Sequence, residues 1–178
     1  MISRISKIAL LLAVAFFYFL VVLNNLTDYG SNYDFVEGVL SMETTFEGNK
    51  LMWRAINSEV VYHIFYATII IWEVATMVLC VWAAWKLFVK LGAPASEFDR
   101  AKDLAYGALT LGLLQWFVAF ITVGGEWFVM WQSPIWNGQD AAFRMFTILG
   151  ICLVFIYLRE DELGATSSAR PAAHASTE

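Results

Sequence analysis

One carboxylate and one carboxamide fall inside otherwise apolar stretches of the sequence. Glu73 lies near the middle of the apolar stretch 60–89, and Gln115 lies within the stretch 104–123. An ionised carboxylate deep in a bilayer is unfavourable by several kcal/mol, so such a group is normally neutral, paired or facing water. Antiparallel neighbouring helices would bring the two side chains to a similar depth, where a hydrogen bond would satisfy both. We interpret Glu73 in one of three ways: as a protonated or hydrogen-bonded residue in helix packing, as a proton or cation site, or as a subunit contact.

A second set of polar side chains is expected at the outer ends of the helices. Its members are Asn24, Asn25, His63, Glu126 and Arg144. Glu126 precedes, and Arg144 follows, a short connection that Pro134 keeps from continuing as helix. Helices joined this closely run antiparallel side by side, so we predict that Glu126 and Arg144 form an ion pair between them.

Three tryptophans occupy the same connection. The amphipathic rings of Trp127, Trp131 and Trp136 favour a membrane–water boundary. They predict an aromatic cap at the outer face that shelters the expected ion pair.

Cofactor, metal and catalytic chemistry find little support in the sequence. His63 is the one histidine in a spanning stretch, which excludes a haem held by two histidines of this chain. A mixed site with Glu126 or a methionine stays open, but a lone histidine near a helix end is more often a hydrogen-bonded interface residue. The chain has no phosphate-cradling glycine loop and no basic patch, so we predict no nucleic-acid partner. We assign no cofactor, metal or catalytic residue, and favour a protein that is not an enzyme.

The composition is that of a membrane protein. Of 178 residues, 60% are hydrophobic and 15% charged, which leaves too little polar surface for a soluble domain. Four stretches are long enough to cross a bilayer as helices, namely 5–23, 60–89, 104–123 and 141–158. They are continuously apolar rather than alternating, which excludes a barrel. We therefore predict an all-α, four-helix antiparallel transmembrane bundle over residues 1–160, with a disordered cytoplasmic tail over 161–178.

The segments between the spans have structure of their own. Between the first two helices, Phe35, Val36, Val39 and Leu40 fall on one helical face, which predicts a partly helical outer loop. The charged run 97–103 follows a capping pattern, so the third helix should begin early as a solvated amphipathic stem.

The basic residues predict the orientation. Eight of the eleven lie at the termini or in the central loop, and three lie in the other two loops. The positive-inside rule places both termini and the central loop in the cytoplasm.

Several motifs resemble one family. They are NNLTDY at 24–29, SMETTF at 41–46, WRAI at 53–56 and GGEWFVMWQSPIWNGQDAAFR at 124–144. Together they resemble a bacterial family of predicted small integral membrane proteins of unknown function, the domain-of-unknown-function family twenty-one sixty-five. The likeness covers about residues 1–161. The resemblance implies a four-span membrane protein of the bacterial inner membrane, and it brings no activity, ligand or catalytic residue.

Two functional hypotheses follow. The first is a non-catalytic accessory or scaffold subunit whose outer face contacts a membrane partner protein or lipid. The second is a small transporter or channel that uses Glu73 and Gln115. Four helices leave little room for a pore, so the second hypothesis requires a homo-oligomer.

Overall fold

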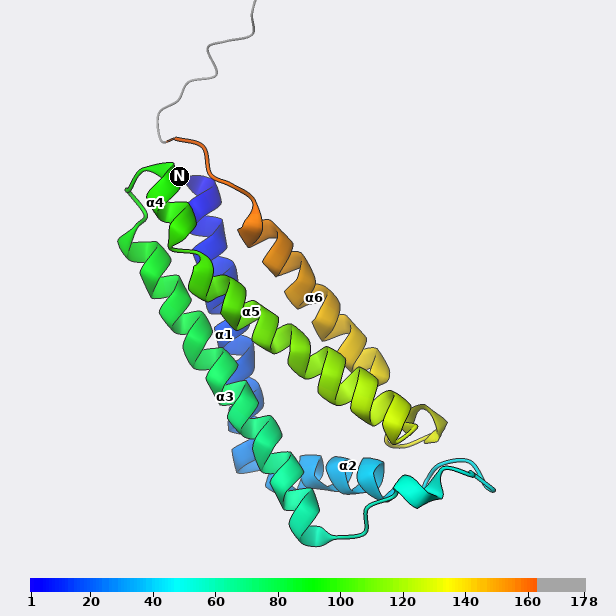
Figure 1. Cartoon of the computed structure of the whole chain (residues 1–178). Helices are drawn as coiled ribbons and strands as arrows, with labels where there is room; N and C mark the ends of the chain where they lie inside the picture. Colours follow the sequence, from blue (N-terminus) through cyan, green and yellow to red (C-terminus); the bar gives the residue numbers. More distant parts are fainter. Residues whose placement is uncertain (163–178) are drawn as a thin grey trace, which may run out of the picture.

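The computed structural model describes residues 1–162, and every regular element in that range is helical (Figure 1). Four long helical segments run up and down as an antiparallel bundle. They are α1 (Ile2–Thr27), α3 (Glu59–Val89), the continuous series α4 (Ala95–Arg100), α5 (Asp103–Leu114) and η2 (Gln115–Trp127), and α6 (Gln139–Tyr157). All four are long and apolar enough to cross a membrane. The predicted fold class is confirmed; of the predicted tail, residues 163–178 lie outside the described residues.

Shorter elements lie at one end of the bundle. They are α2 (Tyr29–Ser41), η1 (Met52–Arg54) and η3 (Met130–Gln132). We name this end the outer end, and the end that holds the N-terminus the inner end (Figure 1). The partly helical outer loop is confirmed by α2 and η1, and Val36, Val39 and Leu40 of α2 are buried. In Figure 1, α2 lies across the bundle axis rather than along it.

Small side chains hold the inner half of the bundle together. Ala83, Ala84, Ala105 and Ala108 are almost fully buried. A Cβ added at Gly112 would lie 2.9 Å from the Tyr18 hydroxyl oxygen, so α1 and α5 approach closely at this point. Such small residues let helix backbones pack together closely. In lipid, where the hydrophobic effect does not drive helices together, this close packing stabilises the bundle.

The outer half of the bundle is forked. At Gln115 the third helix changes from α to π geometry, in which the backbone bonds span five residues rather than four. Phe128 N–H donates to Val123 O in this wider pattern, at 3.0 Å. Beyond Gln115, η2 packs against α6 and diverges from α3, as Figure 1 shows. A π-helix of 13 residues is unusual, because most are single turns.

The beginning of the third helix is amphipathic, as expected, but it buries one of its cations. Glu97, Arg100 and Asp103 are exposed, whereas Phe98 and Lys102 have no exposed side-chain surface. Lys102 Nζ lies 2.6 Å from Asp99 Oδ1 and donates to Leu158 O at 2.7 Å. The regular helix is interrupted at residues 101–102, between α4 and α5.

Glu160, just after α6, lies close to buried cations at the inner end. Lys7 Nζ donates to its carboxylate, and the Nε of the fully buried Arg4 lies 3.9 Å from it. Burial works to raise the pKa of Glu160, but the hydrogen bonds from Lys7 and Ser3 and the charges of Lys7 and Lys102 outweigh burial. The pKa of Glu160 is therefore lowered. We call Arg4, Lys7, Lys102 and Glu160 the inner charge cluster.

Candidate functional site

A buried network of amides surrounds the carboxylate of Glu73, which is 2% exposed. Gln115 Nε2 donates to Glu73 Oε1 at 3.3 Å, so the hydrogen bond expected between these residues is present. Asn25 Nδ2 donates to the other carboxylate oxygen at 2.6 Å. Asn32 Nδ2 in turn donates to Asn25 Oδ1 at 2.7 Å. The carboxylate thus has a hydrogen-bond donor on each oxygen, as a buried acid requires.

Each member of this network comes from a different element. Asn25 is in the last turn of α1, Asn32 in the first turn of α2, Glu73 in the middle of α3, and Gln115 at the α-to-π change. Asp28, with φ −127° and ψ 62°, interrupts the helix and folds α2 back so that Asn32 reaches Asn25. Gln115 Oε1 is buried without a hydrogen-bond partner among residues 1–162.

A cavity of about 340 Å³ reaches this carboxylate, and we call it the polar cavity. Its polar end is formed by Asn24, Asn25, Asn32 and Glu73. The remaining lining is largely apolar and comes from α1, α2, α3, η2 and α6. Glu73 therefore lines a cavity although little of its surface is exposed.

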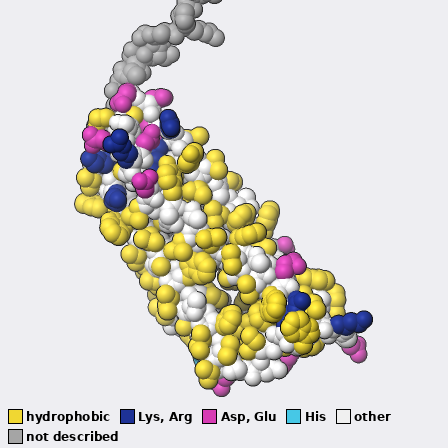
Figure 2. Space-filling model, viewed as in Figure 1, with side chains coloured by type: hydrophobic (Ala, Val, Ile, Leu, Met, Phe, Trp, Pro, Cys, Tyr) yellow, Lys and Arg dark blue, Asp and Glu magenta, His cyan; other side chains and the backbone are white. Residues whose placement is uncertain are grey.

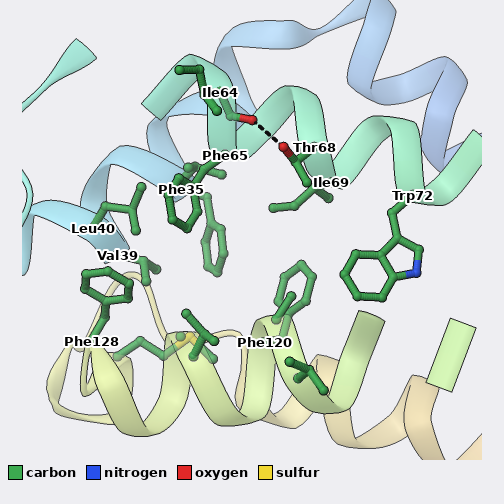
Figure 3. Close-up of a pocket in the computed structure, with 16 residues that line it drawn as sticks. Phe35, Val39, Leu40, Ile64, Phe65, Thr68, Ile69, Trp72, Phe120 and Phe128 are labelled. Atoms are coloured by element: carbon green, nitrogen blue, oxygen red, sulfur yellow. Dashed lines mark hydrogen bonds between the residues drawn. The ribbon is translucent and has the colours of Figure 1, made fainter. Parts of the chain in front are cut away.

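A second cavity, of about 300 Å³, occupies the fork between α3 and η2 (Figure 3). We call it the apolar cavity. Its lining comes from α2, α3, η2 and the connection after η2; Figure 3 shows Trp72 at one end and Leu40 with Phe128 at the other. The hydroxyl of Thr68 donates to Ile64 O of its own helix at 2.8 Å, so it is not free for a ligand.

The two cavities adjoin. Phe35, Val36, Ile69 and Phe120 line both of them. The rings of Phe35 and Phe120 stack with centroids 6.3 Å apart. An aromatic partition therefore separates the apolar cavity from the polar cavity beside Glu73.

The outer polar set does not form one cluster. Asn25 belongs to the Glu73 network, and Asn24 lines the polar cavity. The side-chain partners of His63 come from α2: its Nδ1 is 2.8 Å from the Tyr29 hydroxyl, and its ring lies against Tyr33 with centroids 4.6 Å apart. Among the described residues, His63 forms no hydrogen bond with the other members of the set, because the tyrosines of α2 lie beside it.

The ion pair expected between Glu126 and Arg144 is absent from the described part of the chain. Both side chains are exposed. The close contact between these helices is made by Gly125, where an added Cβ would strike the amide of Gln139. Gly125 is buried at this contact and Gly124 is buried against Met130, whereas Glu126 and Arg144 lie on exposed faces.

Arg54 is the cation that reaches the outer end of η2, and the sequence interpretation missed it. Its guanidinium lies 4.7 Å from the ring centroid of Trp127 and 5.2 Å from that of Trp53. It also donates to the carbonyl oxygens of Trp127 at 3.2 Å and Glu126 at 3.4 Å. Cations are favourable at a helix C-terminus, where carbonyl groups lack intrahelical partners. The WRAI motif contains this residue, but its spacing does not indicate which helix end it meets.

The aromatic cap has partners from the outer loop. Trp127 meets Trp53 and Trp131 meets Phe46, with ring centroids 5.9 and 5.7 Å apart. The remaining member, Trp136, meets Phe35 of α2 at 6.2 Å and is partly buried. The cap therefore joins the connection after η2 to the first loop.

The polar and apolar groups at the outer end are separated from one another. Among the described residues no group of three His, Cys, Asp or Glu side chains could hold a metal ion. Hydrogen-bonding groups are concentrated beside Glu73, and apolar surface is concentrated in the fork.

Comparison with known proteins identifies a family. A family model described as "Predicted small integral membrane protein (DUF2165)" matches residues 3–159, which include all four long helical segments. No curated protein and no solved structure matches the chain.

Proposed function

We propose that this chain, which belongs to the family of predicted small integral membrane proteins (DUF2165), is a non-catalytic lipid-binding protein. An acyl chain lies in the apolar cavity, held between α3 and η2 beneath α2. This is the lipid-contacting form of the accessory role that the sequence suggested.

The lining of the apolar cavity is the observation that carries this proposal. Its two side chains with hydrogen-bonding groups are already used within the protein: Thr68 bonds to Ile64 O, and Trp72 Nε1 donates to Leu111 O at 2.9 Å. A ligand with polar groups along its length would lose hydrogen bonds to water there and gain none. A hydrocarbon chain has no such cost.

The cavity is also placed where a lipid can enter. Ile64 and Phe65 of α3 are 58% and 38% exposed, and Val118 of η2 is 38% exposed. All three line the cavity and lie in membrane-spanning helices, so its rim faces the bilayer. An acyl chain can therefore enter sideways from the membrane.

The test is photocrosslinking with a phospholipid that carries a diazirine near the end of one acyl chain. Ala119 lines the cavity, and Ala119→Phe places an aromatic ring in that space. Ala67→Phe is the matched control, because Ala67 is exposed on α3 and is not part of the lining. We expect crosslinks to cavity residues such as Phe120 and Met130 in the wild type and the control, and their loss in Ala119→Phe. Equal labelling of all three proteins would reject the proposal.

The transport hypothesis is supported by one observation, namely that Glu73 lines the polar cavity. It is tested separately, by proton and cation flux into vesicles that contain the protein. Flux that Glu73→Gln abolishes would favour transport by a homo-oligomer over lipid binding. Lipid crosslinking without flux would favour the lipid-binding role.

A further inference from the structure

We infer that the inner end of the protein carries a separate binding site for the headgroup phosphate of an anionic phospholipid. The site is a groove between the end of α3 and α4, and it does not depend on the function proposed for the outer half. It is distant from the apolar cavity, which lies in the fork at the opposite end.

The groove has a volume of about 690 Å³. Its lining includes Trp82, Trp85, Lys86, Lys90, Glu97 and Arg100, and we call it the basic groove. Figure 2 shows lysine and arginine side chains gathered together with acidic ones at this end of the molecule, above a largely hydrophobic middle.

The charges of the basic groove do not cancel. Lys90 Nζ and Glu97 Oε2 form an ion pair at 2.8 Å, which accounts for the one acid in the lining. Lys86 and Arg100 form no ion pair with any described residue. Three cations and one carboxylate leave a net charge of +2 in the groove, which suits a phosphate.

Three other cations at the inner end are buried. Lys7 and Lys102 are buried and bonded to Glu160, Asp99 or backbone carbonyls. Arg4 is also buried, and it donates to two backbone carbonyls. Lys86 and Arg100 are exposed and remain available to a ligand.

An apolar groove continues from the basic groove along the membrane-spanning helices. It has a volume of about 640 Å³ and is formed by α1 and α3, with Leu12 and Phe16 on one side and Met77 and Val81 on the other. Trp82 and Trp85 line both grooves. These two indoles are 56% and 62% exposed, as expected for tryptophan at the membrane boundary.

This continuity identifies the class of ligand. A phosphate group alone would use only the basic groove, and a hydrocarbon alone would use only the apolar groove. A phospholipid has both parts joined at the depth where the two indoles lie. The net positive charge selects an anionic phospholipid over a zwitterionic one.

The experiment places the full-length protein in nanodiscs of phosphatidylcholine that contain a fixed fraction of a brominated lipid. Bromine on the acyl chain quenches tryptophans within contact, and the brominated lipid is either phosphatidylglycerol or phosphatidylcholine. We expect stronger quenching by phosphatidylglycerol. Trp82→Phe/Trp85→Phe should remove this excess, which assigns it to the two indoles.

Charge variants then test recognition of the headgroup. Each basic residue near a lipid surface contributes about a five-fold preference, so Lys86→Gln/Arg100→Gln should lower the preference for phosphatidylglycerol about 25-fold. The control Lys50→Gln/Arg159→Gln removes two exposed cations outside the groove, and it should keep the preference. All four side chains are exposed, so neither variant should alter the melting temperature in pure phosphatidylcholine.

Three outcomes would overturn the inference. They are equal quenching by the two brominated lipids, an equal loss of preference in the control variant, and complete displacement by millimolar inorganic phosphate. The last outcome would show a site for free phosphate rather than lipid. A preference that persists with phosphate present and weakens at high ionic strength supports the lipid site, because salt screens exposed charges.

Discussion

The Glu73 carboxylate accepts hydrogen bonds from two side-chain amides, which can also form hydrogen bonds with a neutral side chain. In Glu73→Gln, the new amide nitrogen can donate to the unpartnered Gln115 Oε1, so we expect nearly unchanged thermal stability. Glu73→Lys places a buried positive charge beside the two amide donors, so it should lower the free energy of unfolding by about 3 kcal/mol or more. Thermal unfolding in detergent measures both changes. Glu59→Lys, at an exposed position of the same helix, should be tolerated, and equal tolerance of Glu73→Lys would show that Glu73 faces water.

Gly38 provides space for the Trp136 indole. A Cβ built at this position would strike the ring, and the ring is held against Phe35. We expect Gly38→Ala to destabilise the outer end by about 1–3 kcal/mol through overpacking. Gly30→Ala is the matched control on the same helix. A Cβ at position 30 meets nothing within 4 Å, so this substitution should raise the free energy of unfolding by about 0.5–1 kcal/mol. Equal effects of the two substitutions on the unfolding temperature would contradict this account.

At the scale of elements, hydrophobic periodicity predicted the four helices and α2, but not the contacts that depend on how α2 folds back. Asn25 ends an apolar run and resembles an exposed cap residue, and it is buried because the break at Asp28 returns Asn32 to it. Arg54 meets the end of η2 for a similar reason. The π geometry beyond Gln115 has no sequence signature that would have predicted the fork. Contacts between distant segments, rather than local pattern, decide these features.

Glu160 fastens the end of α6 to α1 and α4, and the strength of this attachment should depend on pH. Its pKa in the folded protein is lowered from the ordinary value of 4.5, so its stabilisation is complete above that value. The stabilisation is lost as the pH falls below 4.5 and through the folded pKa.

We therefore expect Glu160→Gln to lower the free energy of unfolding by about 1.5–3 kcal/mol at pH 7, because Lys7 and Lys102 lose their shared carboxylate. The difference in unfolding temperature from wild type should shrink in acid. Asp103→Asn, at an exposed position, should show neither effect. A difference that is the same at pH 7 and at low pH would exclude an ionised Glu160 as its source.

At the scale of the whole molecule, the charge distribution predicts that the inner end faces the cytoplasm. Exposed Ser96 marks the inner end, and exposed Glu47 marks the outer end. In a variant without Cys80 and Cys152, a cysteine at position 47 should react with an impermeant thiol reagent in intact cells. A cysteine at position 96 should react only after the membrane is opened. The reverse pattern would invert the predicted orientation.

The fork also determines how much room the protein needs at each depth of the membrane. The helices are closely packed around Gly112, whereas α3 and η2 separate toward the outer end, so the cross-section widens along the axis. The two lipid leaflets must therefore accommodate unequal protein areas. We expect a wedge of this shape to fit a curved bilayer with less strain than a flat one.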